Sequence, residues 1–200
     1  MEKFPTEEVL EQKTEDGLGL IIKRKVLYHG SATPGIEVMN LAEEDTVGSG
    51  VYFTSEEKDA NGYAKRRSRS KKESSPILYT ASIENLKLLD LRQDENVKKI
   101  LVGFKNVLEE KLKDPKINWA KEAAINNAIE AINLNKVSRG NLREVAFSFG
   151  TSFSEYCRSL GYDGLITFEG GEGEDIGDHD TYLIFDPERA KIIESKEIEK

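Results

Sequence analysis

Short runs of apolar residues mark the first ninety and the last forty residues of the chain. β-Branched and aliphatic side chains dominate these runs, and turn residues separate them, which is typical of β-strands. The predicted strands cover Leu18–Ile22, Val26–Tyr28, Gly50–Thr54, Pro76–Ile83, Leu86–Asp90, Asp163–Phe168, Thr181–Phe185 and Ala190–Ile193. Residues 32–47 combine Pro34 and Gly35 with a run of acids and predict a loop.

The spacing of apolar residues changes to three and four between Asp94 and Leu160, which predicts helices. A further helix is expected from Ser55 through Tyr63, because Ser55 is a favoured N-cap and acids fill the first turn. Gly161 suits a helix C-cap. The helices predicted in the second half of the chain cover Val97–Leu112, Trp119–Ile132 and Leu142–Leu160.

Strands on both sides of a helical segment predict a mixed architecture of strands and helices. The length of 200 residues fits a single domain over residues 1–200. Within it, residues 94–160 form a helical insertion, and residues 1–17 form a tail or a short helix.

Composition and charge limit the classes of partner. Apolar residues make up 38% of the chain, enough for a globular core, and the net charge of −8 gives no general attraction for nucleic acid. The basic run Lys65–Lys72 is the exception, and it is either a solvated loop or a local site for an acidic partner, a nucleic acid or phosphates. Cys157 lies on an apolar helix face and is expected to be buried and inert.

No apolar run is long enough to span a membrane, and the first residues lack the apolar core of a signal peptide. We therefore expect a cytoplasmic protein with no membrane partner.

Two segments carry the candidate chemistry: Leu27–Ser31, which contains His29 and Gly30, and Gly48–Thr54, which contains Tyr52. A glycine without a Cβ allows a ligand to approach the backbone and use its amide groups. His29 can reach a hydroxyl group, and Tyr52 and Tyr63 offer flat faces for stacking. Together these groups suit a planar ring with a carboxamide, such as nicotinamide.

The two segments resemble the histidine and tyrosine motifs of ADP-ribosyltransferases of the His-Tyr-Glu class, the group that includes poly(ADP-ribose) polymerases. The segment from Asp180 to Pro187 resembles the last signature strand of that family. The resemblance implies an α+β fold, a split β-sandwich with a helical insertion, that binds NAD as co-substrate. It also implies specific contacts: ribose at His29, carboxamide at Gly30 and Ser31, and the nicotinamide ring at Tyr52, Phe53 and Tyr63.

The implied activity is mono-ADP-ribosyl transfer to a macromolecular acceptor, with protein favoured over nucleic acid because of the acidic charge. The match is nearest to small bacterial and phage domains, which implies a toxin or defence effector and a partner such as an antitoxin or chaperone. Two alternatives are an NAD glycohydrolase toxin, with water as acceptor, and an inactive module that binds NAD or ADP-ribose.

Two positions depart from the family pattern. Ala60 stands where the polymerases have a serine that bonds the carboxamide, and Thr181 stands where the family has its catalytic glutamate. Asp180 is adjacent but faces the other way in an extended strand, so a bulge is needed to turn it inward. His29, Tyr52, Thr181 and Asp180 are the candidate catalytic residues. The loop acids that are alternative sources of a carboxylate are Glu172, Glu174, Asp175 and Asp178.

The same loop, from Glu169 to Asp180, is rich in glycine and in oxygen ligands for hard cations. Its spacing does not match an EF-hand, so no metal site is expected. We expect this loop to contact the acceptor.

Overall fold

The computed structural model describes residues 11–39, 42–45, 48–70, 74–146, 149–170 and 176–199. Residues 1–10 of the predicted tail lie outside this range, as do the last two residues of the predicted basic run, Lys71 and Lys72. The loop acids Glu172, Glu174 and Asp175 also lie outside it.

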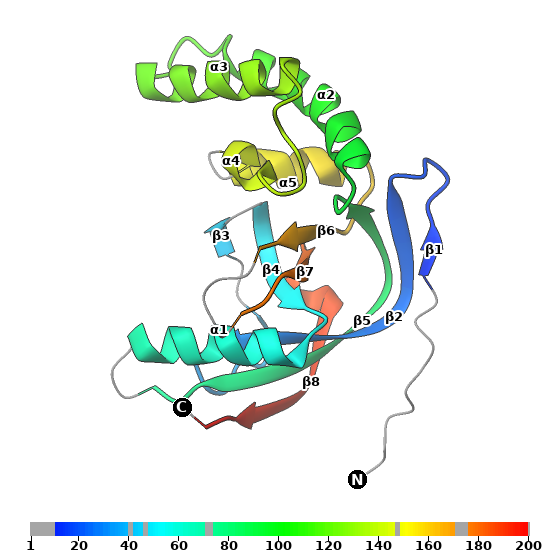
Figure 1. Ribbon diagram of the computed structural model, residues 1–200, viewed down its shortest axis with the longest axis vertical. Helices are drawn as coiled ribbons and strands as arrows, with labels where there is room; N and C mark the ends of the chain where they lie inside the picture. Colours follow the sequence, from blue (N-terminus) through cyan, green and yellow to red (C-terminus); the bar gives the residue numbers. More distant parts are fainter. Residues whose placement is uncertain are drawn as a thin grey trace.

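Strands dominate the first and last parts of the described chain, and most of the helices lie between them, as predicted. The strands are β1 (Glu11–Lys13), β2 (Gly19–Ser31), β3 (Ala42–Asp45), β4 (Gly48–Thr54), β5 (Ile77–Asp90), β6 (Gly164–Glu169), β7 (His179–Ile184) and β8 (Ala190–Glu197). The helices are α1 (Glu57–Ser70), α2 (Asp94–Lys111), α3 (Trp119–Asn133), α4 (Leu142–Ala146) and α5 (Gly150–Ser159). Helices α2 and α3 occupy one end of the molecule, and α1 lies toward the other end (Figure 1).

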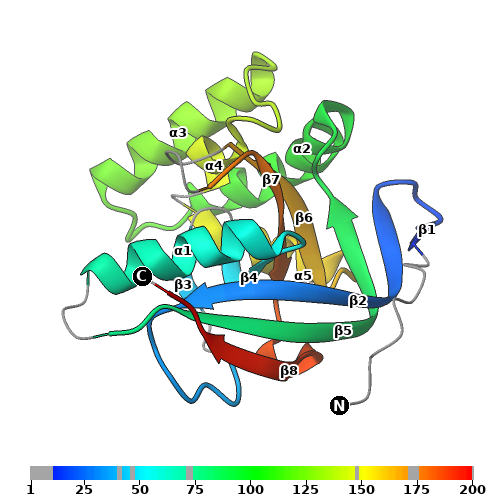
Figure 2. The same cartoon turned by 60° about the horizontal axis from the view of Figure 1, so that its bottom comes forward.

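The strands form a closed circuit of pairings. Strand β2 pairs with β5 along nearly its whole length, and β5 pairs in parallel with β6 at its far end. Strand β6 then pairs with β7, β7 pairs with β4, and β4 returns to β2 at Tyr28 and Thr54. Figure 2 shows the long, bent β2 and β5 side by side beneath α1. The expected mixture of strands and helices is confirmed, and all the described strand pairings except that of β5 with β6 are antiparallel.

Two apolar clusters fill the interior. One lies among the strands and includes Leu27, Phe53 and Tyr182. The other contains residues of both the helical segment and the sheet. Within it, Phe104 of α2 packs edge to face on Phe153 of α5, at 5.0 Å between ring centroids. Cys157 is buried in this second cluster, as expected. Within the predicted helical segment, α3 packs on α2, while α5 packs on β4 and β6. The second cluster also includes Leu165 of β6 and Leu183 of β7, the strands that form a wall of the cavity described below.

Several boundaries differ from the predictions. The two runs predicted on either side of Asn85 form one strand, β5, because the pairing with β2 continues past this residue. Asn85 itself adopts a left-handed conformation with φ of 51°. The two runs before His29 likewise merge into β2. Strand β3 lies within the predicted loop, and β1 within the predicted tail. The helix predicted over Leu142–Leu160 is two helices, α4 and α5.

The basic run is helical in its described part. Residues 65–70 form the last turns of α1, where cationic side chains interact favourably with the helix dipole, so the prediction of a loop is wrong there. None of the described helices is both long and apolar enough to cross a membrane.

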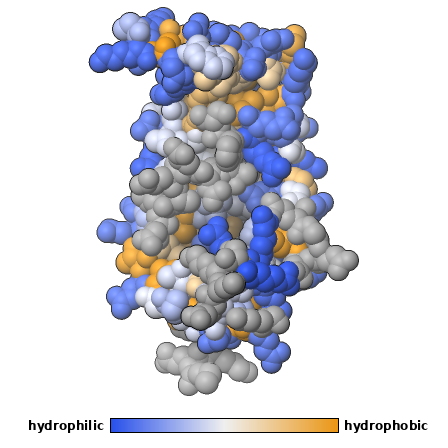
Figure 3. All heavy atoms as spheres, turned by 90° about the vertical axis from the view of Figure 1, so that its left-hand side faces the viewer, coloured by the Kyte–Doolittle hydropathy of each residue, from blue (hydrophilic) through white to orange (hydrophobic). Residues whose placement is uncertain are grey.

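Figure 3 shows the face that lies on the left in Figure 1. Hydrophilic residues cover most of the surface that is coloured there. Orange, apolar residues gather near the top of the view, at the level of α2 and α3 in Figure 1. The exposed large apolar side chains of these two helices and the residue after them include Val102, Trp119 and Leu134.

Candidate active site

A cavity of about 630 Å³ lies where β2, β4, β6 and β7 meet α1 and the segment around α4. It brings together six of the predicted site residues: His29, Gly30, Tyr52, Phe53, Tyr63 and Thr181. Ser31 and Asp180 are not among its lining residues. Most of the predicted site therefore converges from elements that are far apart in sequence.

His29 lies near the end of β2, and its ring is fixed by the neighbouring strand. Nδ1 lies 2.7 Å from the carbonyl oxygen of Tyr52. Because a carbonyl only accepts, Nδ1 carries the proton, which leaves Nε2 as an acceptor in the neutral ring. Phe53 packs against the imidazole edge to face at 5.9 Å between centroids. Burial and the nearby Arg67 lower the pKa of His29, and the bond to Tyr52 only partly offsets them, so the neutral form is favoured.

The lowered pKa of His29 gives a prediction about acid stability. Below the ordinary histidine pKa of about 6.5, the unfolded chain takes up a proton at this position before the folded protein does. Stability therefore falls as the pH decreases, and His29→Gln removes this contribution. We expect the melting temperature to drop less between pH 7.5 and 5.5 for His29→Gln than for the unaltered protein. Equal drops for the two proteins would contradict the assigned protonation.

Gly30 is required by the close approach of α1 to β2. A Cβ at this position would collide with the carbonyl oxygen of Ala60 and with the backbone nitrogen of Ala64. Among the described residues, β2 pairs with β4 at Tyr28 alone. Gly30 therefore pairs with β5 on one edge of β2 and with no described β4 residue on the other. Ser31, the next residue, is buried, and its hydroxyl accepts a bond from the Thr33 amide.

The two tyrosines come from different elements but line the same cavity. The Tyr52 hydroxyl donates to the carbonyl of Gly48 at 2.8 Å, which fixes the ring against β4. The Tyr63 hydroxyl, from α1, donates to Oε2 of Glu169 at 3.1 Å. Burial and the Glu169 carboxylate raise the pKa of Tyr63, so its hydroxyl stays protonated and remains a donor.

Alternate residues of β6 and β7 form one wall of the cavity. Thr181 is buried and lies opposite Thr167 on β6, and His179 lies opposite Glu169. All four line the cavity, as expected from the two-residue period of paired strands, and Phe168, between Thr167 and Glu169, lines it as well.

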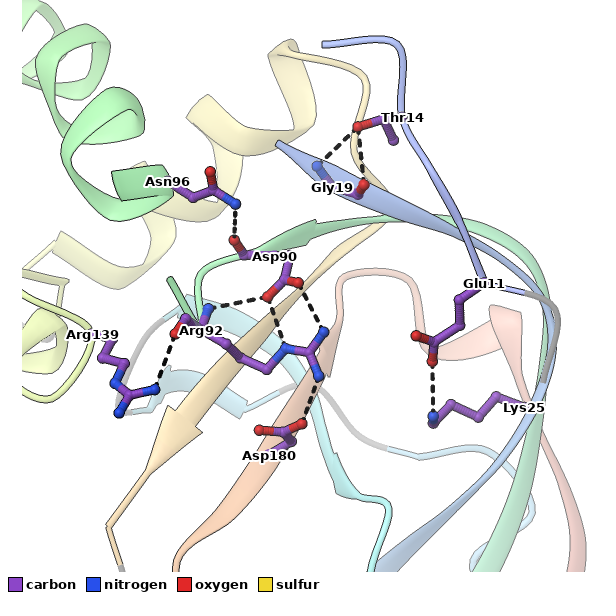
Figure 4. Close-up of polar contacts among 9 residues, drawn as sticks. All are labelled: Glu11, Thr14, Gly19, Lys25, Asp90, Arg92, Asn96, Arg139 and Asp180. Atoms are coloured by element: carbon purple, nitrogen blue, oxygen red, sulfur yellow. Dashed lines mark hydrogen bonds and ion pairs between the residues drawn. The ribbon is translucent and has the colours of Figure 1, made fainter. Parts of the chain in front are cut away.

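Asp180 points to the other face of the sheet, away from this wall. Its Oδ2 lies 2.7 Å from the guanidinium of Arg92, which also binds both carboxylate oxygens of Asp90 (Figure 4). The two carboxylates hold the pKa of Arg92 above its ordinary value. No bulge turns Asp180 into the cavity, because β7 keeps a regular register with β6.

Four arginines line the cavity: Arg66 and Arg67 from α1, and Arg139 and Arg143 from the segment around α4. The chain has nine arginines and twenty lysines, yet no lysine of the described chain lines the cavity. The Arg139 guanidinium lies 4.9 Å from the centroid of Phe168, and it also donates to the carbonyl of Arg92 (Figure 4). Guanidinium groups bind phosphate with two parallel hydrogen bonds. The presence of four arginines in the cavity of an otherwise acidic protein therefore favours a phosphate-bearing ligand.

Sequence reasoning missed Glu169, His179, Arg139 and Arg143 as site residues. The first two carry a detectable signal, since they continue the two-residue alternation of Thr167 and Thr181 just beyond the predicted strands, and the structure extends β6 and β7 to include them. The two arginines lie in the helical segment, and nothing in the local pattern places that segment over the cavity.

Comparison with known proteins identifies a family. Residues 23–199 match the family model described as ADP-ribosyltransferase in polyvalent proteins. No curated protein matches the chain. Among solved structures, the chain is similar to one in the crystal structure of the M. tuberculosis MbcT-MbcA toxin-antitoxin complex. The identity is 11% and the TM-score 0.47, with 92% of this chain and 88% of that chain covered.

Proposed function

The chain belongs to the family of ADP-ribosyltransferases in polyvalent proteins, and on this basis we propose that it transfers ADP-ribose from NAD to a macromolecular acceptor. One observation carries the proposal: His29, Gly30, Tyr52 and Tyr63 line a single cavity of about 630 Å³. A cavity of this volume is in the range of small-molecule and cofactor sites.

Each group has a chemical role in this proposal. Nε2 of His29 accepts a hydrogen bond from a ribose hydroxyl, since Nδ1 is already bonded to Tyr52. The backbone of Gly30 binds the carboxamide, and the rings of Tyr52 and Tyr63 hold the nicotinamide. The arginines of the cavity bind the phosphates of NAD. Ser31, whose hydroxyl bonds to the Thr33 amide and does not line the cavity, has no contact with NAD in this proposal.

We further propose that the strand circuit is the split β-sandwich expected of this family. Strands β2, β5 and β8 form one half, β4, β6 and β7 form the other, and the whole chain is one domain with helices inserted between β5 and β6. The net charge of −8 favours a protein acceptor over nucleic acid. A toxin or defence role, with an antitoxin or chaperone as partner, stays a prediction from the sequence.

Labelled NAD tests the function directly. We expect label from the adenylate part of NAD to appear on a macromolecule in a cell extract, with release of nicotinamide. His29→Ala should weaken NAD binding about tenfold, the loss expected from one hydrogen bond. Lys23→Ala, an exposed position on the same strand, is the matched control. Binding is measured by calorimetry, and labelled proteins are identified by mass spectrometry.

The outcomes separate the alternatives. Nicotinamide release without a labelled macromolecule would indicate that the protein is an NAD glycohydrolase and not a transferase. Binding without turnover would indicate an inactive NAD-binding module. Equal labelling by the unaltered protein and His29→Ala would refute the role of His29.

A further inference from the structure

Transfer of ADP-ribose breaks the bond between C1′ of the ribose and the nicotinamide nitrogen. The bonding electron pair leaves with nicotinamide, so positive charge develops on the ribose. A fixed negative charge near this ribose lowers the barrier. Thr181 occupies the position at which the family resemblance places a carboxylate, and it carries no charge.

Glu169 provides a carboxylate on the same wall of the cavity. It is the last residue of β6 and pairs with His179, while Thr167 pairs with Thr181. Glu169 therefore lies two residues along the strands from Thr181, roughly 7 Å at the usual rise per residue. Both side chains line the cavity.

The Tyr63 hydroxyl holds the Glu169 side chain in place, because it donates a hydrogen bond to Oε2 at 3.1 Å. Nε2 of His179 lies 3.7 Å from the same oxygen. The His179 ring is itself oriented by its Nδ1, which donates to the carbonyl of Gly177 at 2.8 Å. The side chain of Glu169 is 21% exposed, so its charge is partly shielded from water. A fixed and partly buried carboxylate exerts a stronger field than a mobile one in solvent.

The other described carboxylates near the cavity are less suited. Asp180 faces away and is paired with Arg92. Glu144 lines the cavity, but its side chain is exposed on the short helix α4. Asp178 is exposed and does not line the cavity.

We propose that Glu169 is the catalytic carboxylate of this protein, with Tyr63 as its positioning residue. The inference rests on the proposed function. Glu169 stabilises the positive ribose while the C1′–nitrogen bond breaks and neutral nicotinamide leaves. The acceptor's nucleophile then forms a bond to C1′ with its own electron pair, and its proton passes to Glu169 and on to water.

The test compares nicotinamide release and NAD binding in four variants of the full chain. Glu169→Gln should release nicotinamide about 100-fold more slowly, the usual loss on removing one preorganised electrostatic group. Its dissociation constant for NAD should stay within about threefold of the original. Glu169→Asp retains the charge and should lose less activity. Glu194→Gln, the same substitution at an exposed position on β8, is the control and should be fully active.

Asp180→Asn, the fourth variant, tests whether the catalytic carboxylate is that of Glu169 or that of Asp180. If Asp180→Asn abolishes release while Glu169→Gln retains it, the carboxylate is Asp180 and the proposal is overturned. It is also overturned if Glu169→Gln releases nicotinamide within threefold of the unaltered protein. A failure of the proposed function shows differently, as an unaltered protein that leaves NAD intact, and the role of Glu169 then falls with it.

Discussion

Replacing Gly30 with alanine is expected to destabilise the fold and abolish NAD binding together. The new Cβ would meet backbone atoms of Ala60 and Ala64, which cannot rotate away as a flexible side chain can. Relief requires α1 to move off β2. Forcing extra volume into a packed contact typically costs about 1–3 kcal/mol, and we expect the upper end because the collision is with backbone.

The effect on binding follows from what α1 carries. Tyr63, Arg66 and Arg67 all reach the cavity from this helix, so one displacement moves three contacts at once. Misplacement by about 1 Å can reduce activity on the order of 100-fold. Denaturant unfolding and NAD calorimetry on Gly30→Ala measure the two effects. Gly177→Ala is the control for stability, because a Cβ there meets only an ordinary contact at 3.8 Å. Normal binding by a stable Gly30→Ala protein would disprove the helix contact.

Replacing Arg92 with methionine is the second change with a large expected effect. The guanidinium lies between Asp90 and Asp180 at 2.8 and 2.7 Å, and its loss leaves two carboxylates, on β5 and β7 to either side of β6, without their shared cation. Breaking a buried pair costs about 3–5 kcal/mol. These three side chains are 15–31% exposed, so we expect a smaller loss of about 2–3 kcal/mol in the free energy of unfolding.

A matched substitution and a second change make the Arg92 prediction specific. Arg24→Met removes a pairing with Glu84 at 3.6 Å on the exposed surface and should change stability by less than about 1 kcal/mol. Adding Asp180→Asn to Arg92→Met should restore part of the loss, because one uncompensated charge is removed. If Arg92→Met lowers the free energy of unfolding no more than Arg24→Met does, the ion pairs of Arg92 with Asp90 and Asp180 do not stabilise the fold.

The order of strands and helices along the chain was predicted more successfully than their boundaries. Strands were identified from β-branched runs, and the left-handed backbone at Gly161 agrees with the predicted helix end. Merging of the two runs into β5 was not predictable, because Asn85 is a common turn residue and only the long pairing with β2 keeps the strand continuous. The separation of α4 from α5 likewise has no clear local signal in the apolar stripe.

The same limit applies to the candidate site. Residues on one side of a predicted strand were placed well, as the facing of Asp180 away from Thr181 illustrates. Positions such as Arg139 and Glu169 depend on how distant segments meet, which requires the pairing of β6 with β7 and the packing of the helical segment. Local periodicity contains neither piece of information.

The closed circuit of strands has a consequence for the newly synthesised chain. His29 and Thr181 are roughly 150 residues apart in sequence, yet the cavity needs both. Contacts over such separations form slowly, because a long loop must close before they gain any energy. A ribosome that has made β2, β4 and α1 has produced one side of the cavity without the wall formed by β6 and β7. The growing protein therefore has no complete cavity until β7 has left the ribosome and paired with β4.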